Sequence, residues 1–193
     1  MSLKSTTDTW GPVTRALHWV SALVVLGLLG HGWWMTHLAA REVRQWNYGT
    51  HGLIATYFAM LLLVRIVWRG SESTPHQPAS STTLEKAAAR AGHVALYLLM
   101  IGMVATGYLM WSSLPARFDP ARAALFDYSL FGAFKLPGIH AVGDRGVSKY
   151  WESWHEFTSH LLEIVAAIHI SAALWHQHVK RDTVMARMTG RGT

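Results

Sequence analysis

Cysteine is absent from this 193-residue chain, and charged residues are scarce. Without cysteine there can be no disulfide, thiolate nucleophile, iron–sulfur cluster or covalently attached c-type haem. Charged residues make up 15% of the chain, against about 25% in an ordinary soluble protein, whereas 51% of the residues are hydrophobic. This composition indicates a membrane protein. It leaves histidine, with 12 copies, as the main potential metal ligand, because histidine is the commonest ligand to protein-bound metals.

Four apolar runs are long enough to cross a bilayer as helices, which takes about 20 residues each. The runs predict an all-α fold: an integral membrane four-helix bundle, in a single domain over residues 1–193. The first run is too long for the apolar region of a cleavable signal peptide. We expect a loop at residues 37–49, a helical approach to the third span over residues 84–91, and a long loop at residues 113–153. The four predicted spans are residues 16–36, 50–68, 92–112 and 154–176.

The net charge of +6 does not indicate nucleic acid, because the basic residues flank the apolar runs. By the positive-inside rule, the segments richer in Lys and Arg face the cytoplasm. That side is the one that carries both termini, so we expect the N- and C-termini in the cytoplasm of a bacterial cell, with the chain crossing the inner membrane several times. The basic residues on this side are Lys4, Arg15, Arg69, Lys86, Arg90, Lys180, Arg181, Arg187 and Arg191.

Histidines inside the spans are functional candidates, because an ionisable side chain is unfavourable in a bilayer. His155 and His169 are 14 residues apart, which places them within about 40° of one helix face and about 21 Å apart along its axis. Each needs a partner at equal depth. The alternation of span directions pairs His169 with His18 near the cytoplasmic side, and His155 with His51 near the opposite side. A four-helix bundle builds cofactor sites from facing side chains in this way.

Two histidines per site favour haem over a bare ion. They fill both axial positions of a haem iron, whereas zinc prefers three or four protein ligands. Arg65 follows His51 by 14 residues and is expected near the inner site, where it pairs with a haem propionate or simply extends to the interface. His93 is a further cofactor-binding candidate, or an interfacial side chain. Small residues let a flat macrocycle approach, or let helices pack closely: Gly27, Gly30, Gly102, Ala105, Gly107 and Ala172.

Several motifs resemble the bacterial cytochrome b561 family. They are "ALHW" in the first span, "HG" and "RIVWR" in the second, "GHVALYLLMIGMVATGYLM" in the third, and "SWHE" followed by "IHISAALWHQH" in the fourth. The resemblance covers roughly residues 10–190. It implies a four-helix, inner-membrane protein with two b-type haems that exchanges electrons with ubiquinone or menaquinone. Carried over motif by motif, its iron ligands are His18, His51, His155 and His169.

The expected function is therefore electron transfer between the quinone pool and a donor or acceptor at the periplasmic face. Superoxide is one candidate there, which would make the protein a superoxide:quinone oxidoreductase. In that case the long loop steers the anion through Arg117, Arg122, Lys135, Arg145 and Lys149.

Two alternatives stay open. The chain is a haem-bearing membrane anchor of a hydrogenase-like or other periplasmic dehydrogenase complex, or it is a haem-free metal transporter lined by histidines. The sequence leaves the oligomeric state undefined.

Overall fold

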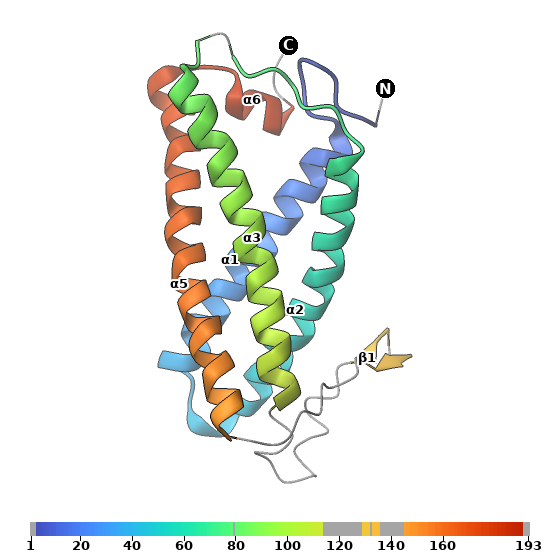
Figure 1. Ribbon diagram of the computed structural model, residues 1–193, viewed down its shortest axis with the longest axis vertical. Coiled ribbons are helices and arrows are strands. Elements are labelled where there is room, and N and C mark those ends of the chain that lie inside the picture. Colours follow the sequence, from blue (N-terminus) through green and yellow to red (C-terminus); the bar gives the residue numbers. More distant parts are fainter. Residues whose placement is uncertain (1–2, 79, 114–128, 132, 136–144, 191–193) are drawn as a thin grey trace. The chain divides into compact units, whose positions relative to one another are not determined.

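The chain folds mainly into long helices. The computed structural model describes residues 3–78, 80–113, 129–131, 133–135 and 145–190. Two short helical segments follow the last long helix, and a two-stranded hairpin comes between α3 and α5 in the sequence (Figure 1). The elements are α1 (Pro12–His37), α2 (Arg41–Gly70), α3 (Thr83–Ser113), β1 (Ser129–Leu130), β2 (Phe134–Lys135), α5 (Arg145–Trp175), the π-helical turn η3 (His176–Lys180) and α6 (Val184–Thr189).

The helices begin at residues suited to that position. Pro12 opens α1, where its missing N–H would have no intrahelical partner in any case. Thr82 and Glu85 form a reciprocal capping box at the start of α3. The Thr82 amide donates to Glu85 Oε2 at 2.8 Å, and the Glu85 amide donates to Thr82 Oγ1 at 3.2 Å. Two otherwise unsatisfied amides are thereby bonded.

Four helices are long and apolar enough to cross a membrane. They contain 26, 30, 31 and 31 residues, or roughly 39–47 Å each at the helical rise. That length exceeds the hydrocarbon core of about 30 Å, so the helix ends extend into the interfaces. The prediction of four spanning helices is confirmed, as is the helical approach at residues 84–91.

Two predicted loops are shorter than expected. Helix α2 begins at Arg41 and α5 at Arg145, inside the segments 37–49 and 113–153 that the sequence assigned to loops. The apolar pattern marks only the part of a helix that lies in hydrocarbon. Polar turns that continue a helix into the interface carry no such signal, so the predicted boundaries were wrong there.

The exterior of the described chain is strongly apolar. Leu23, Val67 and Leu98 are 69%, 65% and 64% exposed, whereas Ser21 and Ser148 are fully buried. A water-soluble protein would bury such leucines and valines. The reversed pattern agrees with helices whose outer surfaces contact lipid.

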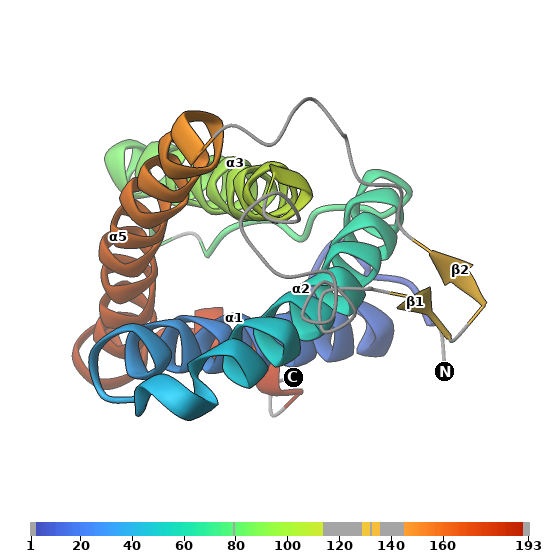
Figure 2. The ribbon, with the colours of Figure 1, turned by 90° about the horizontal axis from the view of Figure 1, so that it is seen from below.

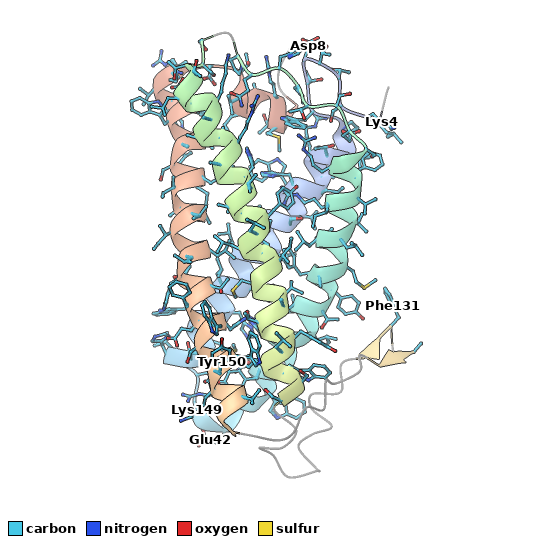
Figure 3. The ribbon with its side chains drawn as sticks, in the orientation of Figure 1. Lys4, Asp8, Glu42, Phe131, Lys149 and Tyr150 are labelled. Atoms are coloured by element: carbon cyan, nitrogen blue, oxygen red, sulfur yellow. The ribbon has the colours of Figure 1, made fainter. Side chains whose placement is uncertain are left out.

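The hairpin pairs β1 with β2 in antiparallel register, Ser129 with Lys135 and Leu130 with Phe134 (Figure 2). Phe131 follows β1 with φ of 54° and projects from the hairpin, 70% exposed (Figure 3). Its amide donates to the Tyr57 hydroxyl of α2 at 3.3 Å, and the two rings lie 5.6 Å apart. The hairpin is thus attached to α2 through Tyr57.

The chain divides into two compact units, each of which draws on all four long helices. Unit 1 comprises Met1–Leu23, Leu61–Leu98 and Leu162–Thr193, and unit 2 comprises Val24–Met60 and Leu99–Leu161. In unit 1, α6 lies beside α1, because the Trp19 indole donates to the Met188 carbonyl at 3.0 Å (Figure 1). The C-terminal helix is thereby held against the helix that carries His18.

Glu72 joins the N-terminal segment to the end of α2 in unit 1. Its carboxylate accepts hydrogen bonds from the hydroxyl and amide of Ser5 and, at 2.7 Å, from the Thr14 hydroxyl. Burial raises the pKa of Glu72, but the hydrogen bonds from Ser5 and Thr14 outweigh that effect and hold the pKa below its usual value. The ionised form therefore stabilises this junction.

Candidate functional site

Unit 1 brings His18 of α1 together with His169 of α5. Their ring centroids are 6.3 Å apart and the ring planes are inclined by 60°. The two histidines that were predicted to pair therefore lie on facing helices at the same level.

The separation can be compared with that of two imidazoles bound to one metal ion. A metal–nitrogen bond of about 2.0–2.1 Å, plus about 1.15 Å from the nitrogen to the centre of a five-membered ring, gives roughly 6.3–6.5 Å between two centroids on opposite sides of the ion. The His18–His169 distance of 6.3 Å falls in this range. Two imidazoles at this spacing would be able to bind one metal ion between them.

Arg65 of α2 contacts His18 directly. Its Nη2 lies 3.0 Å from His18 Nδ1, and its guanidinium lies 5.3 Å from the centre of the Tyr97 ring. Arginine has only donors, so His18 Nδ1 is the acceptor. The predicted position of Arg65 near the inner histidine pair agrees with these contacts, and a cation there suits an anionic group such as a propionate.

His93 of α3 is the third histidine of this cluster. Its ring centroid lies 5.3 Å from that of His169, with the planes inclined by 72°. That distance is too short for two ligands on opposite sides of an ion. His93 Nδ1 donates to the Ala89 carbonyl at 2.7 Å, which leaves Nε2 available. His93 therefore stands beside the pair rather than completing another one.

Unit 2 brings His51 of α2 together with His155 of α5. The ring centroids are 6.5 Å apart and the planes are nearly perpendicular, at 85°. This distance also falls in the range of roughly 6.3–6.5 Å for two imidazoles on one ion. The second predicted pair is thus brought together as well.

Thr106 and Gly107 of α3 position the His155 ring. Thr106 Oγ1 lies 2.7 Å from the Gly102 carbonyl and 3.0 Å from His155 Nδ1. The carbonyl takes the hydroxyl proton, so Oγ1 accepts the Nδ1–H of His155 and leaves Nε2 for a metal. A Cβ on Gly107 would stand 3.1 Å from His155 Cε1. Only glycine leaves the ring this close to the backbone without displacement.

His31 of α1 is a further histidine beside His51 and is not among the site residues predicted from the sequence. Its ring stacks on His51 at 5.7 Å and 22°, and on Trp34 at 5.9 Å and 19°. Thr106 is not among the predicted site residues either. Helical register is the sequence signal for both: Thr106 directly precedes Gly107, one of the small residues expected near a cofactor, and His31 lies three residues before Trp34, on the same side of the first span.

No group of three or more His, Cys, Asp or Glu side chains that would hold a bare metal ion occurs within the described ranges. The donor set consists instead of imidazole pairs, which suits the two axial positions of a haem. Most of the loop that is predicted to steer an anion lies outside the described residues, including Arg117 and Arg122. For Lys135 and Arg145 the structure describes only the backbone.

Comparison with known proteins agrees with this geometry. A family model described as prokaryotic cytochrome b561 matches residues 9–191. The chain is also similar to cytochrome b561 homolog 2 of Escherichia coli (strain K12), with 28% identity over 201 residues that cover 100% of this chain and 97% of the relative.

Four long apolar helices and this family match define a membrane cytochrome of the b type. The chain belongs to the prokaryotic cytochrome b561 family. It is a multi-pass prokaryotic membrane protein of electron transport, with b-type haem as the cofactor that its family implies. The resemblance found in the sequence is confirmed.

Proposed function

We propose that the protein binds two b-type haems, one between His18 and His169 and the other between His51 and His155. The single observation that carries this proposal is the spacing of the two imidazole pairs, 6.3 Å and 6.5 Å between centroids. Because α5 supplies one histidine to each pair, both sites belong to one transmembrane domain over residues 1–193. Arg65 supplies donors beside the His18–His169 pair, where a propionate would accept them. His93, the other proposed cofactor-binding residue, lies beside His169 and would donate to a propionate through Nε2 only as an imidazolium, because its Nδ1–H is used by the Ala89 carbonyl.

A b-type haem held by two of these histidines would supply one-electron exchange, and the two imidazoles would leave its iron no open position for oxygen. We propose that the protein moves electrons between ubiquinone or menaquinone in the bilayer and a donor or acceptor at the periplasmic face, for which superoxide is one candidate. Both termini then lie in the cytoplasm and the helices cross the bacterial inner membrane. The contributions of this chain would be to hold the imidazoles in place, to leave Nε2 of His155 unprotonated through the bond from its Nδ1 to Thr106, and to surround each site with apolar helices.

Haem stoichiometry in single-histidine variants tests the ligand assignment. The wild type is expected to show b-type bands in a reduced-minus-oxidised spectrum and two haems per chain by pyridine haemochrome analysis. His18→Ala and His51→Ala should each remove one haem and retain the other. His37→Ala is the matched control, because His37 is exposed and bonds locally to Thr36 and Trp33. Two haems remaining in either ligand variant would refute its assigned pair.

The reaction partners need a separate measurement. Stopped-flow mixing of the oxidised protein with a quinol, and in another run with superoxide, should reduce the haem at saturable rates. Absence of reduction by both would remove both proposed partners while leaving the haem assignment intact.

A further inference from the structure

Helix α5 carries a polar patch on its outward face, formed by Ser153, Glu156 and His160. All three residues are exposed, and the Glu156 and His160 side chains are 74% and 63% exposed, with His160 Nε2 and Glu156 Oε1 4.0 Å apart. Thr158 is buried. It lies two residues from Glu156, or about 200° around the helix, so the polar patch faces away from the neighbouring helices.

The patch continues into the level of the membrane. Tyr150, Trp151 and Trp154 form a run of aromatic contacts at the start of α5 (Tyr150 is labelled in Figure 3), and such aromatic side chains mark the headgroup region. His160 lies six residues beyond Trp154, about 9 Å deeper along the helix. A polar side chain at that depth is unfavourable against lipid and normally faces protein.

We propose that this patch is the contact between two copies of the protein in the membrane, related by a two-fold axis parallel to the membrane normal. Two copies in one membrane share an orientation, so their α5 helices run parallel. In such an interface the same surface appears on both sides. Glu156, an acceptor, and His160, a donor, lie about 40° apart around α5 and one turn apart along it, so each Glu156 faces the flank of the other copy that carries His160, one turn further along the helix.

The apolar residues that border the patch fit the same contact. Phe157 and Leu161, which follow Glu156 and His160, are 53% and 38% exposed. They would pack against the second copy around the polar pair. Histidine is among the side chains that bond across helices within membranes, so the pair provides both affinity and register.

The test uses the absence of natural cysteine. Ser153→Cys in the patch is compared with Thr50→Cys on α2, in the haem-loaded protein reconstituted in lipid vesicles at high dilution. The positions match: both are exposed, both hydroxyls bond the carbonyl four residues earlier, and each precedes a histidine of the His51–His155 pair. Oxidation should crosslink Ser153→Cys into dimers well above the collisional level given by Thr50→Cys.

Second-site changes test the polar pair itself. An interhelical hydrogen bond changes association by about threefold on average, so His160→Leu, which removes two symmetric contacts, should lower the association constant by roughly eightfold. The exchange variant Glu156→His with His160→Glu keeps the pair and should restore dimerisation. An unchanged haem spectrum shows that each variant is folded. Equal crosslinking of Ser153→Cys and Thr50→Cys, or dimerisation unaffected by His160→Leu, would overturn the proposal.

Discussion

Replacement of Thr106 by valine should raise the midpoint potential of one haem only. Valine keeps the shape of threonine but removes the oxygen that accepts the Nδ1–H of His155 at 3.0 Å. That bond makes a ligating imidazole more basic, and a more basic ligand favours the oxidised iron. The hydrogen bond contributes a net free energy of about 0.5–1.5 kcal/mol, which corresponds to a shift in midpoint potential of roughly 20–60 mV for a one-electron couple.

The assay is a spectroscopic redox titration of the purified protein, fitted with two potentials. Thr56→Val is the matched control, because its hydroxyl also bonds a carbonyl four residues back, Gly52 at 2.8 Å, in helix α2. Thr106→Ser keeps the oxygen and should titrate as the wild type does. If Thr106→Val shifts neither potential more than Thr56→Val does, the positioning role of Thr106 is refuted.

Two further changes have defined outcomes. Gly107→Val should lower the haem content of the protein, because even a Cβ would stand 3.1 Å from His155 Cε1, whereas Gly70→Val at the end of α2, with nothing within 4 Å of its Cβ position, should leave it unchanged in a haemochrome assay. Glu72→Gln should lower the free energy of unfolding by about 1 kcal/mol at neutral pH through weakened hydrogen bonds to a charged acceptor. Since the folded pKa of Glu72 lies below its unfolded value of about 4.3, this stabilisation is present above that pH and is lost as pH falls through the folded pKa. Thermal melts at two pH values should therefore show the wild-type advantage at pH 7 and its disappearance in acid, and an advantage independent of pH would contradict the assignment.

Much of the fold follows from the sequence because bilayer thickness imposes a length on apolar runs. The histidine pairing also followed, since helix direction alternates and equal depths must meet. His18 with His169 and His51 with His155 are adjacent as expected. The helical rise per residue, the helical period and the alternating direction of the spans are enough to predict both pairs.

Side-chain rotation and interfacial turns did not follow from the sequence. The pattern around Thr106 is compatible with any orientation of its hydroxyl, and only the packed helices show that it meets His155. The early starts of α2 and α5 likewise depend on polar residues, whose helical continuation has no apolar signature. Docking of α6 against Trp19 joins residues far apart in the chain, which local patterns do not encode.

The two proposed ligand pairs differ in the partner of their second nitrogen. His155 gives a hydrogen bond to a neutral oxygen, whereas His18 receives one from a guanidinium. A neutral imidazole that accepts through Nδ1 carries its proton on Nε2, so His18 would have to move that proton, and Arg65 would have to release Nδ1, before His18 Nε2 could bind a metal. His155 already has its proton on Nδ1, with Thr106 as the acceptor. The His51–His155 site is thus preset for a metal on the His155 side, whereas loading of the His18–His169 site would turn the Arg65 guanidinium away from His18 and leave its donors for an anionic group of the cofactor.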